Sequence, residues 1–178
     1  MKKIISILVL AFILVSAASC GAGNNAETDP QTTEAQITNA DSQSSDIEKA
    51  ALALVAGLPF DSDIKDTENS VVINPERIYE VFSVSAEDVT KACFYRDMSA
   101  GSAEEVAAFE CANAQAVENV KTALNNRITY LHDQWQSYGP AQVPKIDGAA
   151  IVVEGNCVFF AISNDSSSAQ QIIDNTVN

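Results

Sequence analysis

The chain has 178 residues, of which 24 are acidic and 10 are basic, so its formal net charge at pH 7 is −14. A charge of this sign argues against binding to nucleic acid and against adsorption to anionic lipid head groups. The single histidine excludes metal sites that are built from several histidines of one chain.

Residues 1–19 have the pattern of an export signal. Two lysines precede a mostly apolar run of 15 residues, from Ile4 to Ala18, and the residues at 16–19 are all small. A membrane-spanning helix needs roughly 20 apolar residues, more than this run provides. We therefore expect a cleaved signal peptide rather than a retained transmembrane anchor.

Cys20 directly follows Ala17, Ala18 and Ser19, and small residues before a cysteine resemble a bacterial lipobox. In that motif the thiol receives a diacylglyceryl group and becomes the first residue of the mature chain. Ala17 stands where the motif more often has leucine. Ordinary cleavage after Ser19 is the alternative, because Ala17 and Ser19 also satisfy the small-x-small rule. We favour lipid attachment at Cys20, since an ordinary cleavage site does not need a cysteine.

Residues 20–45 form a predicted linker. They contain no aromatic residue, no lysine or arginine, and only one large aliphatic residue, Ile37. Such a segment buries too little apolar surface to offset the entropy lost on ordering. We expect a disordered, acidic and polar stalk that begins at the lipid-anchored cysteine.

Residues 46–178 have the size of one globular domain. The sequence Ser45-Asp46-Ile47-Glu48 has the form of a capping box and predicts a helix over about 46–56. Residues 58–74 are acidic and are predicted to be irregular. Asn74 and Pro75 then predict the cap and the first position of a short helix that ends near Phe82.

Strands at about 89–98 and 104–111 are predicted to pair across a turn at 99–102. A long helix follows, between a cap at Asn113 and a stop at Gly139-Pro140. Its large apolar residues recur at steps of three and four, so they form one stripe that needs a broad apolar surface to cover it. The stripe comprises Val117, Val120, Leu124, Ile128, Leu131, Trp135 and Tyr138.

Two apolar runs, 148–153 and 157–162, flank Glu154-Gly155-Asn156 and predict a hairpin. Because both runs are continuously apolar, we expect both faces of these strands to be covered. A last helix is predicted at about 167–177. The β-β-α-β-β order with flanking helices predicts an α+β fold, in which a small, mostly antiparallel sheet carries the long helix on one face.

Several stretches of the sequence resemble one group of proteins. They are the segment GSAEEVAAFECAN at 101–113, the helical pattern at 117–127, the Tyr138-Gly139-Pro140 ending and the strand at 155–163. The group comprises uncharacterised lipoproteins of Gram-positive anaerobic bacteria that share a C-terminal domain of unknown function. The resemblance covers about residues 70–165 and implies a lipoprotein with one such domain. It brings no substrate, cofactor or catalytic residue.

The candidates for catalysis are few. Common hydrolase and nucleotide-binding motifs are absent from the sequence. A nucleophilic pair would need Cys93, Cys111 or Cys157 within hydrogen-bond reach of His132. Cysteines more often serve as small buried apolar residues. We expect His132 to be structural or exposed.

The acidic segment at 61–69 contains three oxygen-bearing side chains that a hard cation would accept: Asp61, Asp63 and Asp66. Lys65 and Val72 occupy positions that an EF-hand loop gives to a ligand and to its final glutamate, so an EF-hand is excluded. A looser cation site and a solvated acidic loop both remain open, and we expect no bound metal and no cofactor.

The spacing of Cys93 and Cys111 raises the question of a disulfide. If the first hairpin turns about residue 102, the two cysteines lie opposite each other and could be bonded. A register slip of one residue would separate them. The anaerobic source that the resemblance implies favours free thiols.

Two functional classes agree with these features. The preferred one is a non-enzymatic module on the extracytoplasmic face of the cell membrane, anchored through Cys20, which binds an envelope protein, peptide or glycan. The alternative is a small cell-surface enzyme, such as a cysteine-dependent hydrolase or transferase.

Overall fold

The structure is a computed structural model, and it describes residues 40–99 and 101–177, with side chains from residue 46 onward. The predicted signal peptide, the predicted lipid-attachment residue Cys20 and the predicted linker up to residue 39 lie outside the described residues. None of the described helices combines the length and the apolar character that a bilayer span requires.

The core of the fold is a four-stranded sheet with the order β1-β2-β4-β3, in which every neighbouring pair is antiparallel. Its strands are β1 (Val89–Arg96), β2 (Glu105–Cys111), β3 (Ala150–Glu154) and β4 (Cys157–Ile162). Every residue of the central strand β4 is buried, and so is every residue of β2 except Glu110. The predicted α+β fold, with an antiparallel sheet and one long helix, is confirmed.

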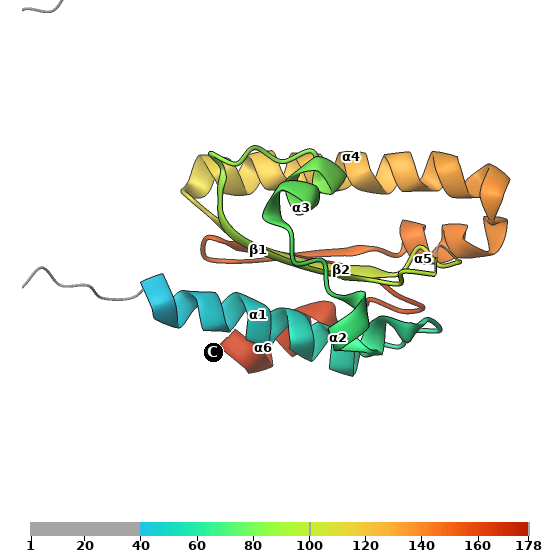
Figure 1. The fold of residues 1–178 in the computed structure, drawn as a ribbon, viewed down its shortest axis with the longest axis horizontal. Helices are drawn as coiled ribbons and strands as arrows, with labels where there is room; N and C mark the ends of the chain where they lie inside the picture. The colour runs from blue at the N-terminus through green and yellow to red at the C-terminus, as the bar shows by residue number, and fades with distance from the viewer. Residues whose placement is uncertain (1–39, 100, 178) are drawn as a thin grey trace, which may run out of the picture. The chain divides into compact units, whose positions relative to one another are not determined.

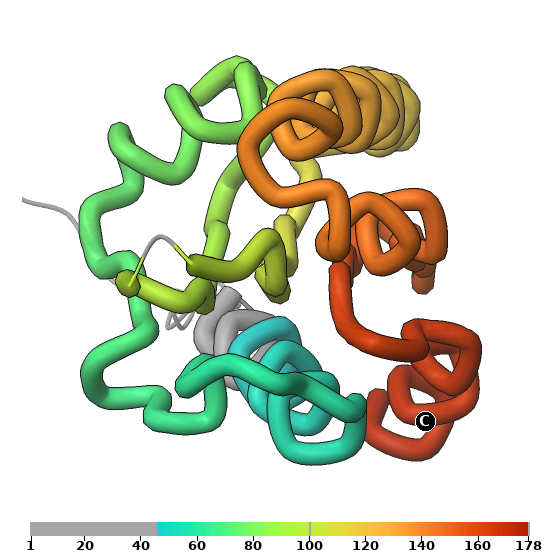
Figure 2. The backbone as a smooth tube through the Cα atoms, turned by 90° about the vertical axis from the view of Figure 1, so that its right-hand side faces the viewer, coloured from blue at the N-terminus to red at the C-terminus, as the bar shows by residue number. Residues whose placement is uncertain are grey.

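Helices cover both faces of this sheet (Figures 1 and 2). On one face lie α3 (Pro75–Phe82), α4 (Ala114–Tyr138) and α5 (Val143–Asp147). On the other face α1 (Ala40–Gly57) and α6 (Ala169–Val177) lie side by side. The sheet is therefore the middle of three layers, with a separate apolar cluster on each of its faces.

Four phenylalanines form the centre of the cluster beneath α3 and α4. Phe82, the last residue of α3, meets Phe94, Phe109 and Phe160 edge to face, with ring centroids 4.9, 5.2 and 5.9 Å apart. Edge-to-face geometry places the positive ring edge against the negative ring face. These contacts fix the end of α3 against β1, β2 and β4.

Two of the predicted helix starts, those at Asn74 and Asn113, are confirmed by their caps. The side-chain oxygen of Asn74 accepts a hydrogen bond from the backbone N–H of Arg77 at 3.1 Å. The Asn113 oxygen accepts one from the N–H of Ala116 at 3.0 Å. Each bond satisfies a backbone donor that the first helical turn leaves unpaired. The predicted second hairpin also forms, and Gly155 in its turn has a φ of +56°, a conformation that favours glycine.

The apolar stripe of α4 faces the sheet along most of the helix. Val120 and Leu124 are fully buried, Leu131 is buried in the same cluster, and Trp135 packs against that cluster. The expectation is wrong at Tyr138, which is 75 % exposed. Besides the sheet, α4 contacts η2 (Pro140–Gln142) and α5. The Tyr138 ring lies edge to face with Trp135, at 5.4 Å between centroids, and the rest of its surface stays exposed.

Three segments differ from the sequence prediction. The first helix begins at Ala40 instead of 46. The segment at 58–74, predicted to be irregular, contains η1 (Asp63–Lys65) and α2 (Thr67–Ser70). Helix α5 was not predicted. Elements of three to five residues are too short to show a helical period, so contacts with the rest of the domain decide their conformation.

Candidate functional site

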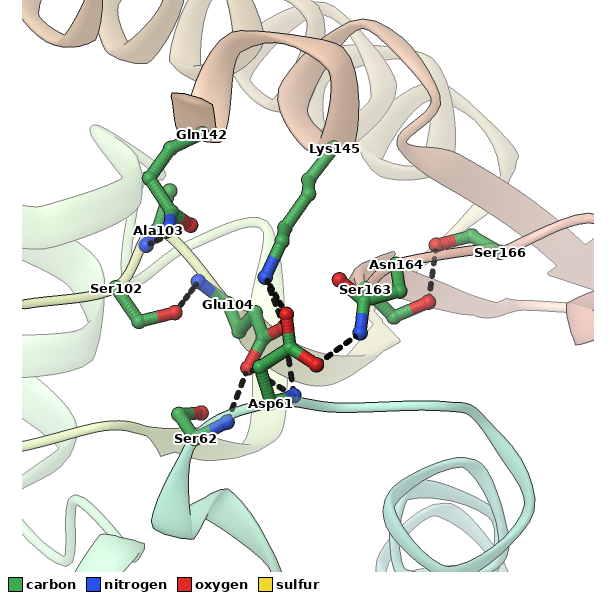
Figure 3. Close-up of polar contacts among 10 residues, drawn as sticks. All are labelled: Asp61, Ser62, Ser102, Ala103, Glu104, Gln142, Lys145, Ser163, Asn164 and Ser166. Carbon is green, nitrogen blue, oxygen red and sulfur yellow. Dashed lines mark hydrogen bonds and ion pairs between the residues drawn. The ribbon is translucent and has the colours of Figure 1, made fainter. Parts of the chain in front are cut away.

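A buried carboxylate, Glu104, lies where the loop after α1 meets the start of β2 and helix α5 (Figure 3). Its side chain is fully shielded from solvent. The carboxylate accepts hydrogen bonds from the backbone N–H of Asp61 at 3.0 Å and of Ser62 at 2.9 Å. The ammonium group of Lys145 donates to it at 2.6 Å. Both carboxylate oxygens are thereby paired inside the protein.

Lys145 and Asp61 extend this network to a fourth segment of the chain. The Lys145 ammonium also donates to Asp61 Oδ2 at 3.0 Å, and the side-chain amide of Asn164 donates to Asp61 Oδ1 at 2.6 Å. The backbone N–H of Asn164 donates to the carbonyl of Pro59 at 2.9 Å. The network thus joins the loop after α1, the start of β2, helix α5 and the segment that follows β4.

The charges of this network are held in their ionised forms. Burial acts to raise the pKa of Glu104, but hydrogen bonds from Lys145, Ser62 and Asp61 outweigh it and lower the pKa. Burial likewise acts to lower the pKa of Lys145, and its bonds to Glu104 and Asp61 raise it instead. A lysine with a raised pKa keeps its proton, so Lys145 is unsuited to act as a base or nucleophile. The role of the network is to hold these four segments of the chain together.

A polar cavity of about 290 Å³ lies beside the network. Several of its lining groups already have partners. Asp97 accepts hydrogen bonds from the N–H and hydroxyl of Ser99 at 2.8 and 2.6 Å, and the Gln142 side chain accepts one from the N–H of Ala103 at 3.2 Å. The cavity is at the lower limit of the size range of ligand pockets, about 300–1,000 Å³.

The structure does not bring the three candidate cation ligands together as a site. Asp61 is paired with Lys145 and Asn164, and Asp66 accepts a hydrogen bond from the amide of Asn69 at 2.7 Å. Within residues 40–99 and 101–177, no group of three or more His, Cys, Asp or Glu side chains could hold a metal ion. Asp63, the third candidate, lies in η1 beside the polar cavity.

The cysteine register differs from the one that a disulfide requires. Strand β1 places Cys93 opposite Ala108, and a bulge between Val89 and Lys91 leaves Cys111 opposite Val89. The Cys93–Cys111 bond that the sequence left open therefore does not form in this structure, in which both residues are thiols. Burial raises the pKa of the Cys93 thiol to about 12 and that of the Cys111 thiol to about 11.

His132 is paired with residues other than the cysteines. Its Nδ1 lies 2.7 Å from a carboxylate oxygen of Asp147, and its Nε2 contacts the amide of Gln136, so the imidazole ties α4 to α5. Cys93 lies towards the opposite face of the sheet, where its Sγ lies 3.9 Å from the Ile47 carbonyl. Cys111 precedes the first turn of α4, about five turns away from His132 along that helix. No Cys–His pair forms among these residues.

A groove of about 410 Å³ runs between α3 and α4, and sequence reasoning did not identify it. Arg77 and Glu80 line it from α3, and Asn126, Arg127 and Tyr130 line it from α4. The chain has three arginines, and two of them line this groove. The spacing of Asn126 and Tyr130, four residues apart on the polar flank of the apolar stripe, is the signal that could have indicated it.

Arg127 is fixed behind the groove by a nearly buried ion pair. Its Nε and Nη2 donate to the two carboxylate oxygens of Glu105 at 3.0 and 2.8 Å. The side chains of Arg127 and Glu105 are 12 % and 5 % exposed. The guanidinium carbon lies 5.5 Å from the ring centroid of Phe82, and Nη1 donates to the Val81 carbonyl at 3.4 Å. This bidentate pair connects α4 with β2 and with the end of α3.

The end of α3 has a backbone conformation that side chains rarely adopt. Ser83 has a φ of +54° and is the one non-glycine residue with positive φ among the described residues. Its N–H donates to the Glu80 carbonyl at 3.3 Å, and the N–H of Val84 donates to the Tyr79 carbonyl at 3.1 Å. This is the hydrogen-bond pattern of a Schellman motif, in which glycine is the usual residue. Ser83 also lines the groove.

The domain has a recognisable family. No curated protein and no solved structure matches the chain. A family model described as a domain of unknown function, DUF4358, matches residues 62–163. The match spans all four strands and α4, and it contains the Glu104–Lys145 and Glu105–Arg127 pairs. The match covers more than half of the chain, so the chain belongs to the DUF4358 family.

Proposed function

We propose that the chain is a non-enzymatic binding module, anchored by lipid at Cys20 to the extracytoplasmic face of the cell membrane. Its ligand would be an envelope protein, peptide or glycan that docks in the groove between α3 and α4. One observation carries the binding role. The buried carboxylates of Glu104 and Glu105 are paired with Lys145 and Arg127 within the protein, whereas the groove presents the exposed side chains of Asn126 and Tyr130.

The state of the thiols favours binding over cysteine-dependent catalysis. The thiolate is the nucleophilic form, and reactive cysteines have a lowered pKa. Burial raises the pKa of Cys93 and Cys111 instead. His132, which would serve as the base, is engaged with Asp147 and Gln136.

The sequence at the N-terminus supports the anchor. Small residues at 17–19 precede Cys20, and the polar segment up to residue 39 has the composition of a tether. A flexible coil of about 20 residues has a root-mean-square span of roughly 22–27 Å. A tether of that length would hold the domain clear of the lipid head groups and leave the groove accessible.

Metabolic labelling with a fatty-acid probe tests the anchor. The wild type and a Cys93→Ala control should be labelled, and Cys20→Ala should not be. Equal labelling of all three proteins would contradict lipid attachment at Cys20.

Site-directed photo-crosslinking in intact cells tests the binding role. A photo-reactive residue at Tyr130 should give a discrete product, and the same residue at the exposed Gln171 on α6 should not. Competition by excess unmodified protein should remove the product. Absence of a product at Tyr130, or identical products at both positions, would contradict a binding function of the groove.

A further inference from the structure

We infer that the groove between α3 and α4 takes a neutral glycan. This inference rests on the proposed binding function and names the class of ligand. Three properties of the groove lead to it: its balanced charge, the hydrogen-bonding groups on its walls, and an exposed aromatic ring on its rim.

The charges that line the groove are compensated within the protein. Arg77 pairs with Glu80 on α3 at 3.2 Å, and Arg127 pairs with Glu105 from β2 at 2.8 Å. Each arginine thus has its own carboxylate. An acidic ligand would have to displace a carboxylate from an arginine, and a basic ligand would compete with an arginine for its partner. A ligand without charge avoids both costs.

The groove still offers hydrogen-bond donors and acceptors. A guanidinium has five N–H groups. The contacts of Arg127 with other described residues use Nε–H, one N–H of Nη2 and one N–H of Nη1, so two N–H groups remain for water or a ligand. The amide of Asn126 can donate and accept, and the carboxylate of Glu80 can accept. Planar groups of this kind suit the adjacent hydroxyl groups of a sugar.

An aromatic side chain lies on the rim of the groove. Tyr130 is 56 % exposed, and its ring can cover the C–H face of a sugar ring. Phe82, in contrast, is 1 % exposed, so its apolar surface is already covered by the protein. A peptide helix that docks in a groove inserts large apolar anchors against large apolar side chains, and Phe82, the phenylalanine that lines this groove, is not exposed for such a contact. A volume of about 410 Å³ is in the range of small-ligand sites and accommodates a short oligosaccharide.

Saturation-transfer NMR on the full chain in lipid nanodiscs tests the inference. The probes are maltotriose, cellotriose and triacetylchitotriose, with an uncharged alanine tripeptide, blocked at both ends, for comparison. At least one sugar should receive saturation, and the tripeptide should not. Tyr130→Ala should weaken binding of that sugar at least tenfold. Tyr138→Ala, which removes a more exposed tyrosine from the same helix outside the groove, should leave binding within twofold.

Three outcomes would overturn the inference: no saturation of any sugar, preferential saturation of the tripeptide, or equal loss of binding in both tyrosine variants. The crosslinking experiment separates these failures from failure of the proposed function. A crosslink at Tyr130 to a protein, together with no sugar binding, would retain the binding module and exclude the glycan. Both tyrosines are exposed, so unchanged thermal unfolding of the variants should confirm that the fold is intact.

Discussion

Replacement of Lys145 by methionine should strongly destabilise the domain at neutral pH. The side chain of Lys145 is 11 % exposed, and its ammonium lies 2.6 Å from the carboxylate of Glu104, which is fully shielded from solvent. Loss of one partner of a buried ion pair costs about 3–5 kcal/mol, because the other charge is left buried. Glu104 keeps its backbone hydrogen bonds from Asp61 and Ser62, so we expect a loss of about 3 kcal/mol, the lower end of that range.

The pH dependence gives a sharper test of the same substitution. The pKa of Glu104 is lowered in the folded wild type, so its stabilising contribution is complete above the ordinary glutamate pKa of 4.5 and is lost as pH falls through the folded pKa. Without Lys145, burial dominates and raises the pKa of Glu104. The folded variant then takes up a proton more readily than the unfolded chain, and its stability falls less on acidification. The stability difference between the two proteins should therefore narrow between pH 7 and pH 4.

Urea unfolding followed by circular dichroism measures both effects. Lys121→Met is the matched control, because Lys121 pairs with Glu118 on the surface, and exposed pairs contribute about 0–1 kcal/mol. In the double variant Glu104→Gln/Lys145→Met, part of the lost stability should return, because the amide oxygen still accepts the backbone hydrogen bonds and no buried charge remains. A loss below about 1 kcal/mol for Lys145→Met, or a difference that does not change with pH, would refute the role assigned to this network.

Three further substitutions or treatments test other parts of the fold. Ser83→Gly should raise the stability of the domain by about 1 kcal/mol, because glycine adopts positive φ without the steric cost that other residues incur. A lower melting temperature of this variant would contradict the left-handed conformation of Ser83 at the end of α3. Leu131→Asp should destabilise the domain by several kcal/mol, since it places an unpaired charge against the sheet. If this variant melted at the same temperature as the wild type, the face of α4 that packs on the sheet would be wrongly assigned. Cys93 and Cys111 should react slowly with iodoacetamide at pH 8 in the folded protein and rapidly in urea. Burial raises the pKa of the Cys93 thiol to about 12 and that of the Cys111 thiol to about 11. Equal reaction rates in both conditions would show that the thiols are accessible in the folded protein.

The fold was largely predictable because its signals are local. The stripe on α4, the caps Asn74 and Asn113 and the apolar hairpin each involve residues close in sequence, where helical or strand period and turn chemistry decide the conformation. The prediction is wrong at Tyr138, because no local pattern shows where α4 passes the edge of the sheet. Local patterns also left the pairing of Cys93 with Cys111 open, because the bulge between Val89 and Lys91 and the position of the turn set the register.

The site was far less predictable, because its residues come together only in the folded domain. Glu104 and Lys145 are 41 residues apart, and Glu105 and Arg127 are 22 apart. The adjacent glutamates Glu104 and Glu105 at the start of a largely apolar strand were an available signal, since a carboxylate in a buried strand needs a partner. The sequence thus shows that these glutamates require partners, but it does not show which of the few basic residues provide them. For the groove the sequence offers only the spacing of Asn126 and Tyr130 on α4, because the two walls of the groove belong to separate helices.

The strand order also determines when the domain can fold. Central strand β4 pairs with β2, and the pairing of Glu105 with Ile162 joins residues on either side of α4 and β3. Closing such long loops slows folding, because chain entropy is lost before the contacts that compensate for it have formed. A nascent chain that ends before β4 has only the β1–β2 hairpin, and the inner edge of β2 and much of the apolar surface of α1 and α4 lack their partners. Completion of the sheet is thus a late event, and a chain truncated within the last two strands would expose a strand edge prone to aggregation.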